Sequence, residues 1–368
     1  MKTLLHIDNS PAITGGYKAL LSWCLQNPQW QHIWILPKGS FVSAETSRYF
    51  KVYELPMVEI GKSPTKLVSY LPMLWYNGRK LQAILKKEQP NLIHTNDLNN
   101  LLPYAVKRQV PFIVHARRLQ RSFPVPLYNF WKQWHLKRAD GIVAVSQAVK
   151  KDWNNDERVT VIYDPITIHE QYPPYHFYKQ EEQPFRFLYL SNYIQGKGQD
   201  DALKAIAMLQ DKGVTNFKVD FYGGTMGLEK NVTYKKNLEA FVNENKLDDI
   251  VTFHGLVQDV EQVMKQYHAL LHFSHAESFG MVCYEALYYR LPVISSDCGG
   301  PAEMIDNGRS GILLPLKDIA AYADAMESFI VNPEIPHNLS LAAHDYLTNI
   351  HSQTYDLSVF FSKYLSNK

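Results

Sequence analysis

Short apolar runs alternate with amphipathic stretches along almost the whole chain, and this alternation constrains the fold more than any other feature. Short apolar runs predict buried strands, and helical stretches between them favour parallel sheets covered by helices. The predicted strands of the first half are residues 3–7, 32–36, 92–95, 111–115, 141–145 and 160–163. Those of the second half are residues 185–190, 218–222, 251–253, 270–273, 292–295 and 311–314. The expected fold class is therefore α/β, with two Rossmann-like domains.

Helical spacing of apolar residues predicts the connecting helices at residues 17–25, 65–87, 147–153, 199–211, 234–245, 257–266, 281–289 and 319–331. A length of 368 residues also favours two domains, each with its own core. Residues 166–184 are rich in Pro, Tyr, Gln and Glu and lack periodicity, so they are expected to form a linker. The predicted domains are residues 1–165 and 185–350, followed by a C-terminal helix within residues 351–368.

Charge and cysteine content exclude several classes of protein. A net charge of +2 does not suit a chain that binds nucleic acid over its whole surface. Three widely spaced cysteines without a Cys/His ligand pattern suggest a reducing compartment and no structural zinc. The apolar N-terminus is short and broken by His6 and Asp8, unlike a signal peptide, and no apolar run approaches the roughly 20 residues of a membrane helix. We expect a cytoplasmic protein.

Glycines, small polar residues and charges follow the predicted strands. Gly15 and Gly16 come after the first strand, and Asn192 and Lys197 follow the first strand of the second half. Ligands of open α/β sheets bind outside the carboxyl ends of the strands. We therefore expect a site for a phosphate-containing and sugar-like ligand at this edge of each sheet, in the cleft between the domains.

Glu277 and Glu285 flank a turn that contains Ser278 and Gly280, with seven residues between the two glutamates. A carboxylate at a strand end can accept hydrogen bonds from a polyhydroxy ligand, while the N–H groups of the next helix face its anionic part. The plain alternative is two surface carboxylates. Because Glu285 lies in an apolar helical stretch, where an unpaired charge is costly, the pattern favours recognition of a nucleotide-linked sugar.

For three further motifs, an ordinary structural role is the alternative to a role in ligand binding. Gly15-Gly16 is not a GxGxxG fingerprint, and an ordinary glycine turn fits equally well. Lys197 between two glycines can reach a diphosphate or can be a solvated loop lysine. His115 ends a strand, where it can bond a sugar hydroxyl, handle a proton or simply pack in the core.

Aromatic and basic residues also mix at positions 128–138, close to Arg117 and Arg118. Such a helix can lie on an anionic membrane surface. The alternative is a partly buried helix with a basic outer face.

In order and spacing these motifs resemble those of the group 1 glycosyltransferases, also called family 4, which have the GT-B fold. The similarity covers nearly the whole chain, and its strongest motif is the pair Glu277 and Glu285. Supporting matches are Gly15-Gly16, residues 91–95, Val114-His115, residues 139–146, Lys197-Gly198, residues 251–255, residues 299–303 and Asn307-Gly308.

The resemblance implies retaining transfer of a sugar from a nucleotide-diphosphate donor, without a metal or other cofactor. Glu277 would contact the donor sugar, Glu285 the ribose hydroxyls, and Lys197 the leaving diphosphate. It also implies that the last helix crosses back to the N-terminal domain. The catalytic set is Glu277, His115 and Lys197. The donor-binding set is Gly15, Gly16, Asn192, Lys197, Ser278, Phe279, Gly280, Met281 and Glu285.

Two positions depart from the family pattern. Asn192 stands where the family usually has an arginine, so we expect diphosphate binding to rest more heavily on Lys197 or on another base such as Arg117 or Arg118. Asp164-Pro165 replaces the usual Asn-Gly after the last strand of the first domain.

The expected function is glycosyl transfer in the synthesis of a bacterial surface polysaccharide, such as capsule, O-antigen or lipopolysaccharide. The expected partners are a nucleotide sugar, a glycan or polyprenyl-linked glycan acceptor, and the anionic inner membrane as a peripheral contact. The alternatives are a nucleotide-sugar epimerase of the same architecture and a non-catalytic nucleotide-sugar binding protein, the latter suggested by the missing arginine.

Overall fold

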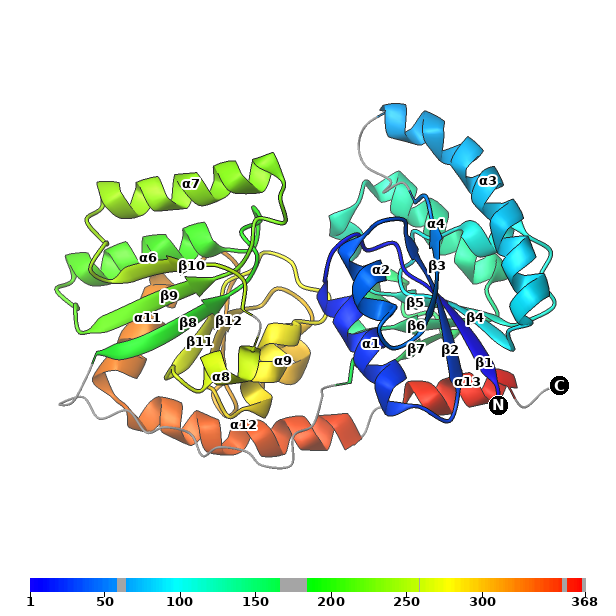
Figure 1. The fold of residues 1–368 in the computed structure, drawn as a ribbon. Coiled ribbons are helices and arrows are strands. Elements are labelled where there is room, and N and C mark those ends of the chain that lie inside the picture. Colours follow the sequence, from blue (N-terminus) through cyan, green and yellow to red (C-terminus); the bar gives the residue numbers. More distant parts are fainter. Residues whose placement is uncertain (58–63, 166–183, 258, 353–355, 366–368) are drawn as a thin grey trace. The chain divides into compact units, whose positions relative to one another are not determined.

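A computed structural model describes residues 1–57, 64–165, 184–257, 259–352 and 356–365. The chain divides into two compact units (Figure 1). Unit 1 comprises Met1–Thr167 with Thr354–Lys368, and unit 2 comprises Ile168–Gln353. Each unit is built on one parallel sheet covered by helices, so the predicted fold class is confirmed. The predicted linker falls almost entirely outside the described residues.

The sheet of unit 1 has seven parallel strands in the order β3-β2-β1-β4-β5-β6-β7. The central strands are buried from end to end because helices cover both faces, which explains their continuous apolar runs. The strands are β1 Thr3–Ile7, β2 Gln31–Pro37, β3 Lys51–Leu55, β4 Leu92–Thr95, β5 Phe112–Ala116, β6 Gly141–Ala144 and β7 Val159–Val161.

Six helices accompany this sheet, apart from short 3₁₀ turns, in the described part of unit 1. The last of them, α13, buries Phe360 and Phe361 in the same core as Leu4, Trp34 and Val143. The C-terminal helix is therefore part of unit 1. The helices are α1 Gly15–Gln26, α2 Phe41–Thr46, α3 Pro64–Glu88, α4 Val125–Arg138, α5 Gln147–Asp152 and α13 Leu357–Leu365.

Helix α4 contains the aromatic and basic stretch for which the sequence left two interpretations. Its residues Tyr128, Trp131, Lys132 and His135 are buried, and Lys132 Nζ donates to the carbonyl of Asp152 at 2.9 Å. The structure therefore shows a partly buried helix, on which Val125 and Phe130 stay exposed, and a contact of this helix with a membrane stays a prediction.

The sheet of unit 2 has six parallel strands in the order β10-β9-β8-β11-β12-β13. The strands are β8 Phe185–Leu190, β9 Phe217–Tyr222, β10 Val251–His254, β11 Ala269–His272, β12 Val293–Ser296 and β13 Ile312–Leu314. The helices are α6 Gln199–Asp211, α7 Glu229–Glu244, α8 Val260–Met264, α9 Met281–Tyr288, α10 Pro301–Met304, α11 Ile319–Val331 and α12 Glu334–Ser352. Among the described residues, no helix is both long and apolar enough to cross a bilayer.

Candidate functional site

Three loops meet at the carboxyl edge of the unit 2 sheet, after the neighbouring strands β8, β11 and β12. His275 N donates to the carbonyl of Gly196 at 2.9 Å, which joins the first loop to the second. Glu277 N donates to Cys298 O at 3.0 Å, and Gly300 N donates to Glu277 O at 2.8 Å, which joins the second loop to the third. Backbone bonds on both sides therefore hold Glu277 in place.

Two glycines make this close approach feasible. Gly198 adopts a φ of +77°, and a Cβ atom there would overlap the carbonyl oxygen of Phe273. Gly280 adopts a φ of +93° directly before α9, and a Cβ atom would come within 2.7 Å of Pro301 Cγ. An L side chain at either position would be strained, so the glycines noted in the sequence serve the packing of the loops.

Lys197 and Glu277 form an ion pair at the centre of this edge, with Lys197 Nζ 2.6 Å from Glu277 Oε2. Burial works to lower the pKa of Lys197, but the Glu277 carboxylate outweighs it and raises that pKa overall. His272 is buried next to Glu277, with its Nε2 3.8 Å from Glu277 Oε2. Burial lowers the pKa of His272 to about 4, so this imidazole is neutral at pH 7.

Glu285 lies one turn into α9, on the helix face that it shares with Met281, Val282 and Tyr289. These residues recur at helical spacing and are half-buried, whereas Cys283, Tyr284 and residues 286–288 are buried. Glu285 is therefore a half-buried carboxylate and is not enclosed in the core. The apolar neighbours in the sequence belong to the opposite face of the helix.

The turn before α9 places the remaining predicted residues of this motif. Phe279 is buried and its ring centroid lies 5.2 Å from that of Tyr284, so only its backbone can serve a ligand. Gly280 and Met281 open the helix, whose first N–H groups have no acceptor within the helix. Ser278 stands beside them in the same turn. This helix start can bind an anion.

Asn192 is occupied with the structure of its own loop. Its Oδ1 accepts a hydrogen bond from Gly224 N at 3.0 Å, and its carbonyl accepts one from Gln199 Nε2 at 2.9 Å. The residue that replaces the usual arginine is thus neutral and holds the loop after β9 against the loop after β8.

Unit 1 gathers the other predicted residues, Gly15, Gly16 and His115, at the carboxyl edge of its own sheet. Thr14 caps α1 by accepting from Tyr17 N at 3.2 Å, so Gly15 and Gly16 begin the helix. A Cβ atom on Gly16 would come within 2.9 Å of Arg117 Cδ. The glycine therefore allows the arginine to lie across the helix start.

Arg117 is paired rather than available as an open cation. Its Nη1 donates to both carboxylate oxygens of Asp164 at 2.7 Å, and its Nε donates to Asn96 Oδ1 at 2.6 Å. Arg118 pairs with Asp97 at 2.6 Å. Both arginines that the sequence suggested as substitutes for the missing one thus already have carboxylate partners.

His115 is only 2% exposed, and its Nδ1 lies 3.3 Å from Arg117 Nη2. Burial, followed by the charge of Arg117 and the neighbouring His94, holds the pKa of His115 well below its ordinary value. Its Nε2 has no hydrogen-bond partner within the described ranges. The predicted role of His115 in catalysis stays a prediction.

Among the residues that the structure describes, two groups of side chains have the spacing of a metal site, one in each unit. His6, Cys24 and His32 lie in the unit 1 core, where His6 Nε2 and His32 Nδ1 are 3.0 Å apart in a hydrogen bond. In unit 2, Asp201 Oδ2 and His275 Nε2 lie 2.7 Å apart, and Asp200 accepts from the hydroxyl of Tyr234 at 2.9 Å. In both groups, side chains of the same unit therefore already bond these nitrogen and oxygen atoms.

The structure brings together Lys197, Glu277, Glu285 and the turn 278–281 in unit 2, and Gly16 and His115 in unit 1. His272 was not predicted as a site residue from the sequence, although it stands at a strand end five residues before Glu277. The pairing of Arg117 with Asp164 was not predicted either, because 47 residues separate the two.

Comparison with known proteins covers both halves of the chain. The family model for glycosyl transferases group 1 matches residues 176–345, and the model for Glycosyltransferase Family 4 matches residues 21–170. The chain is 26% identical over 271 residues to lipopolysaccharide 1,6-galactosyltransferase of Escherichia coli K12, which covers 68% of each chain.

A second relative is the mouse alpha-1,3/1,6-mannosyltransferase ALG2, with 30% identity over 165 residues, or 43% of this chain and 40% of that protein. The chain thus spans less than half of this relative. Among solved structures, Anabaena Alr3699/HepE in complex with UDP and glucose superposes with a TM-score of 0.78 at 18% identity, covering all of both chains. That likeness supports the two-domain fold.

Proposed function

This chain belongs to the group 1, or family 4, glycosyltransferases of the GT-B fold, and we propose that its unit 2 edge binds a nucleoside-diphosphate sugar. The observation that carries the proposal is the Lys197–Glu277 pair beside the start of α9. An ammonium group, helix N–H groups and a carboxylate stand together there. These groups suit a diphosphate and a sugar bearing hydroxyls.

In the proposed reaction, the bond between the sugar anomeric carbon and the diphosphate oxygen breaks, and the nucleoside diphosphate leaves with the electron pair. Lys197 and the N–H groups at Gly280 and Met281 stabilise the charge that develops on it. The acceptor hydroxyl oxygen forms the new glycosidic bond, and its proton passes to the departing diphosphate. We propose that the configuration is retained and that no metal takes part.

The diphosphate and Glu277 compete for Lys197 in this scheme. When the donor binds, Lys197 turns to the diphosphate, and the Glu277 carboxylate becomes available to the sugar hydroxyls. Glu285 binds the ribose, because its half-buried side chain lies one turn along α9 from Met281. His115 keeps its proposed catalytic role, as a contact to the sugar or the acceptor.

We further propose that the acceptor is a glycan, free or polyprenyl-linked, in the synthesis of a bacterial surface polysaccharide. The support is the similarity to a lipopolysaccharide galactosyltransferase over 68% of the chain. The cytoplasmic face of the inner membrane is the site of action that fits such an acceptor.

The test is transfer of a labelled sugar from UDP-, GDP-, ADP- or CMP-sugars to lipid and glycan extracts by the purified protein. We expect one donor to be used, retention of the anomeric configuration by NMR of the product, and loss of transfer in Glu277→Ala with the fold intact. Full turnover by that variant would contradict the role of Glu277. Donor binding without transfer to any acceptor would instead support a non-catalytic binding protein.

A further inference from the structure

Helix α3 presents two neighbouring rows of exposed side chains, which we call the α3 surface. Residues three or four apart on a helix lie in line, so each row runs along the helix axis. The large apolar members are strongly exposed: Leu71 is 70%, Trp75 64% and Tyr76 45% exposed. The outer row is Leu71, Trp75, Arg79, Gln82 and Lys86, and the second row is Pro72, Tyr76, Lys80, Ala83 and Lys87.

The opposite face of α3 explains why these rows are exposed. Asn77, Leu81 and Ile84 are buried and attach the helix to unit 1, with Asn77 Nδ2 donating to the carbonyl of Pro56 at 2.7 Å. Leu71 and Trp75 therefore do not belong to the core. Exposed clusters of large apolar side chains usually mark an interaction site.

Charge is distributed unevenly along the α3 surface. The apolar residues occupy its first two turns and the basic residues its later turns, and the sequence has no Asp or Glu between positions 64 and 87. The guanidinium of Arg79 lies 5.0 Å from the ring centroid of Trp75, and Lys80 Nζ lies 5.7 Å from that of Tyr76. Aromatic and cationic groups thus stand side by side.

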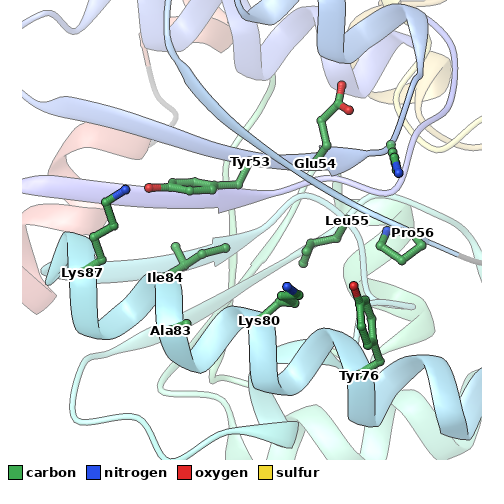
Figure 2. A pocket seen from close by; sticks show the side chains of 10 residues that line it. Tyr53, Glu54, Leu55, Pro56, Tyr76, Lys80, Ala83, Ile84 and Lys87 are labelled. Carbon is green, nitrogen blue, oxygen red and sulfur yellow. The ribbon is translucent and has the colours of Figure 1, made fainter.

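A groove of about 450 Å³ runs along the second row, between α3 and the edge strand β3 (Figure 2). Lys38, Lys80 and Lys87 line it together with Tyr53 and Tyr76. The groove therefore offers three ammonium groups beside two aromatic side chains.

Glu54 is the acidic residue among those that line the groove. Its carboxylate accepts hydrogen bonds from Ser43 Oγ and from Gly39 N, and Figure 2 shows it directed away from α3. Glu88, at the end of the helix, is paired with Lys51 at 2.7 Å. Both carboxylates therefore have partners of their own, and the groove keeps a positive character that suits a phosphate group.

We propose that the α3 surface docks on an anionic lipid bilayer, with a phospholipid headgroup phosphate in the groove between α3 and β3. Trp, Tyr and Leu side chains enter the interfacial region of a bilayer, and adjacent Lys and Arg bind its phosphates. A second copy of this chain fits poorly, because it would bring a second set of cations against the first. The proposal rests on the proposed membrane-linked acceptor, and it assigns the contact to α3 rather than to α4.

The test is flotation of the full chain with vesicles of phosphatidylcholine, with or without about one third phosphatidylglycerol. We expect binding only to the anionic vesicles, and weaker binding as salt is raised. Arg79→Gln, Lys80→Gln and Lys86→Gln together should weaken binding about a hundredfold, since each basic residue near an anionic surface contributes about fivefold. Leu71→Ser with Trp75→Ser should weaken it at least tenfold.

Matched variants elsewhere serve as controls. Val125→Ser with Phe130→Ser removes apolar side chains of α4 that are 53% and 48% exposed, and should leave flotation unchanged. Lys230→Gln, Lys236→Gln and Lys246→Gln remove three exposed charges of unit 2 and should likewise change little.

A measurement of nucleotide-sugar binding distinguishes a failure of the membrane proposal from a failure of the proposed function. The α3 variants should bind the donor as the wild type does, so a loss of flotation with intact donor binding supports the α3 surface alone. Three results would overturn the proposal: no flotation of the wild type, equal flotation of the α3 variants, or a dimer that Leu71→Ser with Trp75→Ser converts to monomer.

Discussion

Replacing Glu277 with glutamine should abolish sugar transfer and yet tighten the binding of a free nucleoside diphosphate. In the free protein Lys197 Nζ lies 2.6 Å from Glu277 Oε2, and a diphosphate must displace that carboxylate. In Glu277→Gln the ammonium group has no anionic competitor in this pair. Affinity for the diphosphate therefore rises, although the contact to the sugar is lost.

The size of the effect follows from the exposure of the pair. A hydrogen bond to a charged group contributes about 1.5–3 kcal/mol, and water weakens this one because the two side chains are 29% and 21% exposed. A competition of about 1–2 kcal/mol corresponds to roughly five- to thirtyfold tighter binding. This value of about 1–2 kcal/mol lies between the contributions of exposed and of buried ion pairs.

Isothermal titration calorimetry with the nucleoside diphosphate of the preferred donor measures this change. Glu285→Gln is the matched control, since it changes a carboxylate of the same site that is assigned to the ribose, and it should weaken binding. Weaker binding in Glu277→Gln as well would refute the competition between Glu277 and the diphosphate.

Three further predictions concern the fold and the chemistry. Gly198→Ala should lower the free energy of unfolding by about 2 kcal/mol or more, because of its positive φ and the overlap with Phe273 O. Gly196→Ala is the control, since Gly196 has a φ of +91° but open space around it, and it should cost about 1 kcal/mol. Thermal unfolding measures both. Burial lowers the pKa of His94 to about 3 and of His135 to about 4, so the unfolded state takes up protons first as the pH falls below 6.5. Each of the two histidines should then lower the free energy of unfolding by about 1.4 kcal/mol per pH unit, from pH 6.5 down to its own pKa in the folded state. In urea unfolding, the free energy of unfolding of His135→Gln should therefore fall less steeply with decreasing pH than that of the wild type. Sugar transfer should persist after dialysis against EDTA, because Lys197 is the proposed partner of the diphosphate, and a loss that magnesium restores would contradict this.

The sequence predicted the buried strands well because a strand covered on both faces is apolar along its whole length. It failed at β3, where only Leu55 is buried and the four residues before it are exposed or partly exposed at the edge of the sheet. Helix α12 was also missed, although Glu334–Ser352 is one continuous helix. Its burial pattern depends on packing against α9 and α11, elements that lie before it in the chain.

Within the candidate site, local spacing was enough to find the glutamate pair and the lysine between glycines. It could not show that Lys197 and Glu277 touch, since 80 residues separate them and only the order of β8, β11 and β12 brings their loops together. The same limit applies to Arg117, because its ion-pair partner Asp164 follows a different strand. Which face of α9 carries Glu285 likewise depends on tertiary packing.

The most direct test of a donor site at the Lys197–Glu277 pair is a thermal-shift and calorimetry screen of the wild type against UDP-, GDP-, ADP- and CMP-sugars, repeated with Lys197→Gln. Binding of one donor raises apparent stability in proportion to the logarithm of its concentration over its dissociation constant. We expect one clear donor for the wild type and a loss of at least tenfold in affinity for Lys197→Gln, with the fold retained. Equal affinity in the two proteins, or no binding of any nucleotide sugar, would contradict a donor site at the Lys197–Glu277 pair.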